Sequence, residues 1–231
     1  MDGGFFFIFI LFVLLMIALA IYGWYAAAKR QQELAAWAKR HGMRFNPDSV
    51  YHMDDRFPEF GCLSQGSNRY AYNVLEGEWA GRPFLGFDYH YETRSTNSKG
   101  QSQTHHHDFS AVILTSDIPL KPLTICPAGF FDRVAAFFGY DDINFESAEF
   151  SRRFHVKAPD RKWAYDVFHA RTIEFLLEQP TFSLQFDRRS VIAHNGSTFS
   201  LGEFEAAAEL IRGVLDRLPE YVIQQQRLER S

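Results

Sequence analysis

Cysteine is scarce in this 231-residue chain, which has only Cys62 and Cys126, far apart and outside any Cys-x-x-Cys pair. A disulfide framework needs several cysteines, and a thiol-rich metal site needs closely spaced ones. The sequence also lacks the GxGxxG, GxxxxGK[ST], HExxH and GxSxG motifs, which mark dinucleotide, nucleotide, zinc-protease and serine-hydrolase sites. The commonest routes to catalysis are therefore absent, and no cofactor is expected.

An excess of positive charge is absent as well. The chain has 24 Lys and Arg against 28 Asp and Glu, which gives a formal net charge of −4. Proteins that bind nucleic acid carry a basic surface that neutralises phosphates. Nucleic acid is therefore not an expected partner.

Only one long hydrophobic run is present, from Phe5 to Ala28, and all its residues except Gly23 are hydrophobic. As a helix it would be about 36 Å long, enough to cross a hydrocarbon layer of about 30 Å. No second run reaches the roughly 18 to 20 residues that a membrane span needs, which excludes a multi-span transporter. We therefore predict a tail and transmembrane anchor over residues 1–28, with the lipid bilayer as the partner of Phe5 to Ala28.

A cleaved signal peptide is the alternative for this run. Signal peptides begin with basic residues and have short apolar cores, whereas this chain begins Met1-Asp2-Gly3-Gly4 and its run is longer. The alanines near the end of the run leave cleavage open, but the pattern favours an uncleaved anchor.

Basic residues gather after the apolar run, and none precedes it. They are Lys29, Arg30, Lys39, Arg40 and Arg44. Positive charge flanking a span stays on the cytoplasmic side. We therefore expect the inner (plasma) membrane, with the N-terminus outside and the C-terminal domain cytoplasmic. Determining topology is the favoured role of these charges, and binding of anionic lipid is the alternative.

The helix is predicted to continue past the membrane as a basic stalk over residues 29–45. Leu34, Trp37 and Ala38 would form an apolar stripe at helical spacing, and His41-Gly42 would end the helix. A cytoplasmic domain over residues 46–223 and a polar, fraying tail over residues 224–231 complete the division.

The domain sequence predicts antiparallel strands mixed with helices, an α+β class, with two to three helices packed on the hairpins. Period-2 alternation predicts that Phe87 and Tyr89 are buried, whereas Asp88, His90 and Glu92 face water. The predicted strands are Tyr70–Trp79 and Arg82–Tyr91 around Ala80-Gly81, then Phe109–Thr115 after a polar loop Thr93–Thr104, Leu120–Cys126, Phe150–Lys157, Thr181–Phe186 and Ser190–His194. The predicted helices are a short one from Phe130 to Phe138, one from Arg161 to Glu178 capped by Asp160, and one after a Ser200–Glu203 capping box.

A histidine cluster, His105-His106-His107-Asp108, lies beside the polar loop. If the hairpin closes across residues 95 to 104, Glu92 faces His107, and His105, His107 and Glu92 could bind Zn²⁺ or Ni²⁺. Adjacent strand residues point to opposite faces, so only His105 and His107 could converge from the triplet. Contact with solvent is the favoured interpretation, so no metal site is assigned and the metal site remains the alternative.

Other charged residues have structural and functional interpretations. Arg152 shares the parity of core positions in its predicted strand, so it would be paired with Glu149 or Asp160, or else bind an anion. The pairs Asp54-Asp55 and Asp141-Asp142 are typical of turns, with Mg²⁺ binding as the alternative.

Three segments carry a resemblance to a family. They are Leu34–Phe45, Leu75–Arg82 leading to Phe87–Tyr91, and Phe150–Val156 with Asp160. In these the chain resembles bacterial single-span membrane-anchored proteins of unknown function. The resemblance implies a basic stalk and a cytoplasmic α+β domain, carries over no site residue, and places the histidine triplet in a variable hairpin tip.

The sequence therefore favours a non-enzymatic binding or scaffolding module at the cytoplasmic membrane surface, with a protein partner there. The alternative is a membrane-tethered metal-dependent enzyme that uses the His105 to Asp108 cluster. Metal content of the purified protein would separate these two hypotheses.

Overall fold

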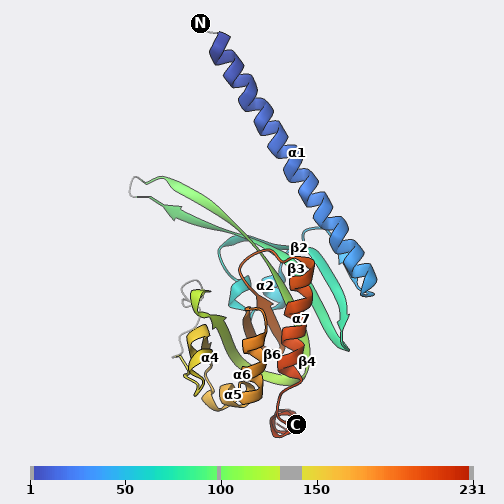
Figure 1. The fold of residues 1–231 in the computed structure, drawn as a ribbon, viewed down its shortest axis with the longest axis vertical. Helices are drawn as coiled ribbons and strands as arrows, with labels where there is room; N and C mark the ends of the chain where they lie inside the picture. The colour runs from blue at the N-terminus through green and yellow to red at the C-terminus, as the bar shows by residue number, and fades with distance from the viewer. Residues whose placement is uncertain (1–2, 98–99, 131–141, 229–231) are drawn as a thin grey trace.

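The computed structural model describes residues 3–97, 100–130 and 142–228. A long N-terminal helix leads into an antiparallel sheet that is packed with shorter helices (Figure 1). The predicted α+β class is therefore confirmed.

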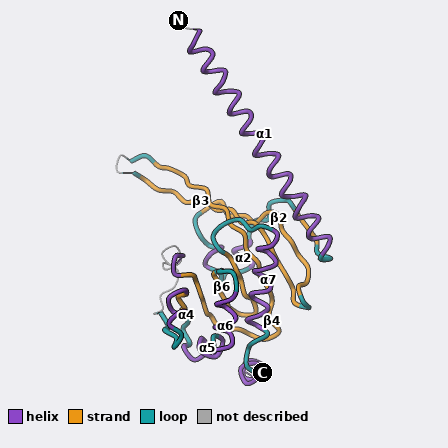
Figure 2. Tube along the Cα trace, in the orientation of Figure 1, coloured by secondary structure: helices purple, strands orange, loops and turns teal. Residues whose placement is uncertain are grey.

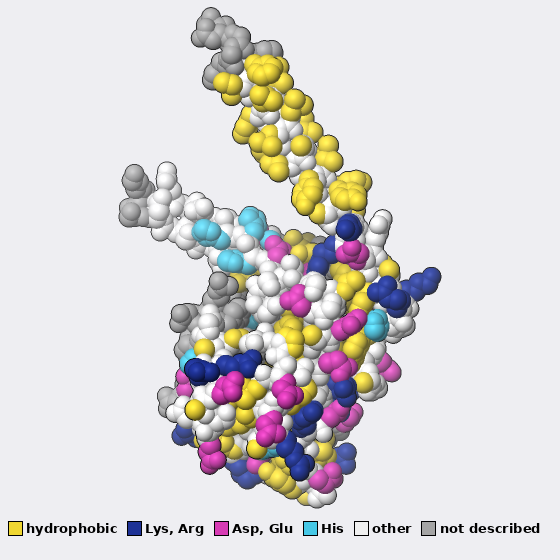
Figure 3. All heavy atoms as spheres, viewed as in Figure 1, with side chains coloured by type: hydrophobic (Ala, Val, Ile, Leu, Met, Phe, Trp, Pro, Cys, Tyr) yellow, Lys and Arg dark blue, Asp and Glu magenta, His cyan; other side chains and the backbone are white. Residues whose placement is uncertain are grey.

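Helix α1 runs without interruption from Gly3 to Arg40. Its stop was predicted correctly, because Gly42 adopts a left-handed φ of 66°, a conformation that glycine adopts without steric cost. The apolar side chains from Phe7 onward are exposed along the part that projects from the domain (Figure 3). Among the described residues, this is the helix long and apolar enough to cross a bilayer, with a mean hydropathy of 2.7. Its length and composition suit a membrane anchor.

The described strands form a six-stranded sheet in the order β1-β2-β3-β4-β5, with β6 also paired to β4 (Figure 2). Every pairing is antiparallel. The long strand β4 pairs first with β3 and β6, and then with β6 and β5. The strands are β1 (Arg44–Asn46), β2 (Ser67–Trp79), β3 (Arg82–Thr96), β4 (Ser102–Pro127), β5 (Phe154–Lys157) and β6 (Ser183–His194).

The turn at Ala80-Gly81 between β2 and β3 was predicted correctly, and both residues have positive φ. The polar loop predicted over Thr93–Thr104 was wrong, because β3 continues to Thr96 and β4 begins at Ser102. Polar side chains bond across these strands, and Thr suits extended backbone. The end of β3 up to Thr96 and the start of β4 from Ser102 form a projecting hairpin, which we call the β3–β4 arm. It points toward the same end of the molecule as the N-terminus of α1 (Figure 1).

Two predicted strand boundaries were also wrong. β6 is one strand rather than a hairpin, since Arg188 has a φ of 52° at an irregularity in its pairing with β4. That geometry is typical of a bulge. The strand predicted over Phe150–Lys157 begins only at Phe154, because Ser147 caps a preceding helix by accepting a hydrogen bond from the Phe150 N–H.

The remaining helices lie mainly in the C-terminal half. The capping box of Ser200 and Glu203 and the Asp160 cap were predicted correctly, although the helix after Asp160 is divided in two. The tail predicted to fray is helical through Leu228. The helices are α2 (Met53–Arg56), α4 (Ala148–Arg153), α5 (Arg161–Val167), α6 (Ala170–Glu178), α7 (Leu201–Leu215) and α8 (Glu220–Leu228). The helix predicted over Phe130–Phe138 lies, past Phe130, outside the described residues.

Buried side chains form two clusters. One joins the end of α1, the sheet and α7, and includes Leu34, Trp37 and Phe204. The other packs residues 50–63 against the sheet and includes Phe60 and Phe87. Because both faces of the sheet are covered, the prediction that Asp88 and His90 face water was wrong, and both are buried.

Candidate functional site

An ion pair joins helix α1 to the centre of the sheet. Arg30 of α1 donates from Nε to Oδ2 of Asp88 at 3.0 Å and from Nη2 to Oδ1 at 2.7 Å. The Asp88 side chain has no exposed surface, and the Arg30 side chain is 30% exposed. Two parallel bonds between a guanidinium and a carboxylate fix their relative orientation as well as their distance. The pair therefore sets how α1 lies on the domain.

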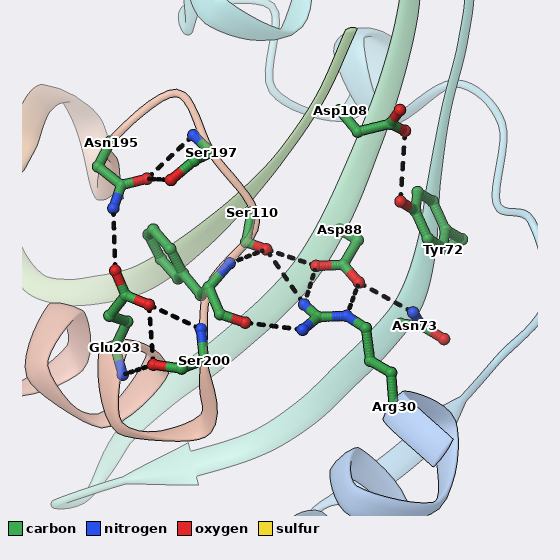
Figure 4. A network of polar contacts seen from close by, with 11 residues as sticks. Arg30, Tyr72, Asn73, Asp88, Asp108, Ser110, Asn195, Ser197, Ser200 and Glu203 are labelled. Carbon is green, nitrogen blue, oxygen red and sulfur yellow. Dashed lines mark hydrogen bonds and ion pairs between the residues drawn. The ribbon is translucent and has the colours of Figure 1, made fainter. Parts of the chain in front are cut away.

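Neighbouring groups complete the bonding of this pair (Figure 4). Asn73 donates to Asp88 at 2.9 Å, and the Ser110 hydroxyl donates to the same carboxylate. Nη1 of Arg30 donates to the Phe199 carbonyl at 2.8 Å. Asn73 has a φ of 51° at a bulge in β2, and asparagine tolerates this conformation better than most residues. The bulge thus aims an amide at the buried charge.

The same network reaches the start of α7. Ser110 accepts a hydrogen bond from the Phe199 N–H at 2.8 Å, immediately before the Ser200 cap. Hydrogen bonds from the N–H and hydroxyl of Ser200 and from Asn195 hold the pKa of Glu203 below its usual value. The anchor, the sheet and α7 are therefore connected by continuous polar contacts.

A tryptophan pair forms a second contact between α1 and the domain. Trp37 and Trp79 stack with centroids 6.1 Å apart and planes at 9°. Each indole N–H donates to a glutamate of α7, Trp37 to Glu205 and Trp79 to Glu209, both at 2.7 Å. The apolar stripe predicted on the stalk is buried in the domain core. The last turns of α1 are thus part of that core.

The flanking basic residues have different environments. Arg30 forms its ion pair with the buried Asp88. Lys29 pairs with Glu33, and Arg44 pairs with Glu76, both at exposed positions. Lys39 and Arg40 are exposed. A cluster of five residues free to bind anionic lipid is therefore not formed.

The histidines are arranged differently from the prediction. Glu92 pairs with His106 rather than His107, while His105 pairs with Thr93 and His107 with Tyr91. A register change of one residue moves a side chain to the other face of a sheet. His105 and His107 therefore lie on the face opposite Glu92, and the predicted ligand set of His105, His107 and Glu92 is not brought together.

His105 and His107 instead bond to hydroxyls of β3. His107 Nε2 lies 2.8 Å from Oγ1 of Thr93, and its ring stacks on Tyr91 at 4.7 Å. His105 Nε2 lies 2.9 Å from Oγ of Ser95. These contacts support the strands of the arm.

The opposite face of the arm brings together His90, Glu92 and His106. Oε1 of Glu92 is 3.9 Å from Nε2 of His90 and 3.5 Å from Nδ1 of His106. A hydrogen bond from Asn68, followed by the nearby imidazoles, lowers the pKa of Glu92. The sequence had indicated histidine and carboxylate chemistry at this arm, but it could not supply the register.

A cleft of about 640 Å³ lies beside the arm, lined in part by Cys62, Tyr91, His107 and His194. Burial raises the pKa of Cys62 to about 12 and lowers the pKa of His194 to about 4. At neutral pH the first is a thiol and the second a neutral imidazole. Because the thiolate is the reactive form of cysteine, the cleft is not built for thiol catalysis at Cys62.

The remaining predicted candidates make the following contacts. Arg152 is exposed on α4 rather than aligned with the core, and its neighbour Arg153 donates to the Leu177 carbonyl at 2.8 Å. Asp54 pairs with Arg69, and Asp55 with His52, each at 2.8 Å. Of the second aspartate pair, Asp142 lies 3.0 Å from His155, and Asp141 lies outside the described residues.

Comparison with known proteins gives one likeness in fold. No protein-family model and no curated protein matches the chain. Among solved structures, the chain is similar to the crystal structure of the mycobacterial trehalose monomycolate transport factor A, TtfA, with a TM-score of 0.54 and 12% sequence identity. The match covers 82% of this chain and 96% of TtfA. At this identity the likeness concerns the fold alone.

Proposed function

We infer that this chain is a single-pass protein of the inner (plasma) membrane, with its N-terminus outside and its domain in the cytoplasm. Its α+β domain acts as a non-enzymatic binding or scaffolding module, held in a fixed orientation at the membrane surface. The observation that carries this inference is the Arg30–Asp88 pair within an uninterrupted α1.

A tether that served only for attachment would need no defined geometry. Here the helix that leaves the membrane enters the domain core directly, where Leu34 and Trp37 are buried. A bidentate ion pair and the hydrogen bond from the Trp37 indole to Glu205 then fix its rotation. Such a junction transmits the orientation of the anchor to the whole domain.

The direction of the anchor is supported by the charge that follows it. Lys39 and Arg40 are exposed at the domain end of α1, and positive charge is retained in the cytoplasm. TtfA, which shares the fold, is a transport factor. A membrane-associated role without catalysis suits the present chain, because its uninterrupted apolar α1 would present the domain beside the bilayer.

Topology is tested by labelling a single exposed thiol, introduced as Gln224→Cys on α8. Cys62 and Cys126 are buried with raised pKa values, so they give little background. A membrane-impermeant maleimide is expected to label the variant only after the membrane is permeabilised. Labelling of intact spheroplasts would contradict the proposed orientation, and the variant without Gln224→Cys controls for background.

Orientation is tested with spin labels on the full chain in nanodiscs that carry paramagnetic headgroups. A label at Gln103 on the arm should relax faster than one at Arg171 on α6, because the arm points toward the anchor end and α6 lies at the opposite end (Figure 1). Arg30→Ala should reduce this difference. Equal relaxation of the two labels in the unsubstituted chain would overturn the fixed orientation.

Binding is tested by cross-linking in native membranes, followed by affinity purification. The unsubstituted chain and the Lys29→Ala control should recover the same protein in comparable yield. Asp88→Ala, which removes the partner of Arg30, should recover less of it. Recovery of no protein, together with no binding of the domain to lipid vesicles, would count against a binding or scaffolding role.

A further inference from the structure

A potential metal site lies at the base of the β3–β4 arm, on the face away from His105 and His107. His90 and Glu92 come from β3, and His106 comes from the paired position on β4. One ligand atom from each of the three lies within 4.8 Å of the others. Two imidazoles and a carboxylate are a known set for zinc.

The spacing of these atoms suits a bridging ion. With zinc bonds of about 2.0 to 2.2 Å, two ligands in a tetrahedral site are about 3.4 Å apart. The separations from Glu92 Oε1 are 3.5 Å to His106 Nδ1 and 3.9 Å to His90 Nε2. Direct hydrogen bonds between such atoms are usually 2.7 to about 3.2 Å long. The three groups therefore converge without bonding well to one another.

A second, independent observation is the support behind the ligands. Nδ1 of His90 lies 2.9 Å from Oδ1 of Asp108, and Asn68 donates to Glu92 at 2.8 Å. When Nδ1–H donates to a carboxylate, the Nε2 lone pair is left for a metal, and such backing is typical of metal-binding histidines. The His90 ring also stacks on Tyr70 at 4.9 Å. The orientation of His90 is thus held by contacts other than those with Glu92.

We propose that His90, Glu92 and His106 bind one Zn²⁺ ion, with a fourth coordination position open to solvent. The His106 side chain is 63% exposed, whereas those of His90 and Glu92 are 9% and 17% exposed. The ion joins β3 to β4 and fixes the base of the arm. Its open position accepts water or a carboxylate from a bound partner. The site is independent of the membrane orientation proposed above.

The test is a zinc titration of the purified full chain in detergent, in competition with a chelator, with metal content measured after gel filtration. His106→Ala is the main variant, because an exposed side chain can be removed without disturbing the fold. His105→Ala is the matched control, since it removes the neighbouring exposed imidazole from the other face. Asp108→Asn tests the support of His90.

We expect one zinc ion per chain, and at least about tenfold weaker binding for His106→Ala and for Asp108→Asn. His105→Ala should bind as tightly as the unsubstituted chain. With Co²⁺ as the probe, visible absorption of a four-coordinate ion should be lost only when a ligand is replaced. Equal weakening by His105→Ala and His106→Ala would overturn the proposal, as would sub-stoichiometric zinc in the unsubstituted chain. Neither result affects the thiol-labelling test of topology.

Discussion

Arg30 and Asp88, 58 residues apart in the chain, meet through two hydrogen bonds at the point where the anchor enters the domain. Asp88 lies between Phe87 and Tyr89 on β3, and all three are completely buried. A carboxylate in such a place is costly unless a cation accompanies it. Helix α1 supplies that cation through Arg30.

Removal of the cation should therefore destabilise the domain. Arg30→Met leaves Asp88 buried without its partner, and we expect a loss of about 3 kcal/mol in the free energy of unfolding. Urea unfolding in detergent, followed by tryptophan fluorescence, measures it. Lys29→Met is the control, since its pair with Glu33 is exposed and 3.9 Å long. Adding Asp88→Asn to Arg30→Met should restore part of the stability, and equal stability of the two single variants would contradict the role of the pair.

Trp37 should contribute strongly to the same junction. Trp37→Ala removes a 1% exposed side chain and its bond to Glu205, and large-to-small changes of this kind cost about 3 to 5 kcal/mol. Limited proteolysis should then cut near His41 at lower protease concentration. Ala36→Ser, on the exposed side of the same turn, should behave like the unsubstituted chain, and an unchanged cutting pattern in Trp37→Ala would show that the contact is dispensable.

Two glycines of α7 should respond to alanine with opposite signs. A Cβ on Gly213 would lie 2.2 Å from Cζ of Phe175, whose ring is covered by Arg217 at 3.9 Å. We expect Gly213→Ala to destabilise the protein by about 1 to 3 kcal/mol through overpacking. A Cβ on Gly202 would have no atom within 4 Å. Gly202→Ala should therefore raise the free energy of unfolding by up to about 1 kcal/mol. Thermal unfolding compares them, and a Gly213→Ala midpoint at or above that of Gly202→Ala would refute the packing argument.

His194 should make stability depend on pH below neutrality. Burial lowers its pKa from 6.5 to about 4. Between these two pH values His194 is protonated in the unfolded chain and neutral in the folded chain. The contribution of neutral His194 to the free energy of unfolding is complete above pH 6.5. It is lost as the pH falls toward 4, by roughly 3 kcal/mol in total. His194→Gln should show a shallower loss over that range in urea unfolding. Parallel pH profiles for the two proteins would show that other groups dominate.

Much of the architecture could be predicted from local sequence. The long apolar helix, its stop at Gly42, the turn at Ala80-Gly81 and the Ser200–Glu203 capping box depend on neighbouring residues, and the structure confirms each. Such features are determined by periodicity, glycine conformation and short-range hydrogen bonds.

Features that depend on distant contacts were missed. Alternation in β3 indicated that Asp88 faces water. The sequence around Asp88 cannot show that Arg30 of α1 packs against that face. The bulge at Arg188 looked like a turn for a similar reason, since pairing with β4 keeps β6 continuous. The predicted pairing of Glu92 with His107 was wrong by one residue, since Glu92 pairs with His106. That shift places His105 and His107 on the face of the sheet opposite Glu92.

The order of synthesis determines when the contacts of Arg30 with Asp88 and Phe199 can form. Arg30 leaves the ribosome long before Phe199, whose carbonyl it binds across 169 residues of sequence. The apolar helix is therefore available for insertion into a bilayer before the Phe199 carbonyl that Arg30 binds has been synthesised. Domains fold as units once their chain is complete, so the contact between Arg30 and Phe199 can form only late in synthesis. The last turns of α1 therefore wait for the C-terminal half of the chain before the junction around Arg30 is complete.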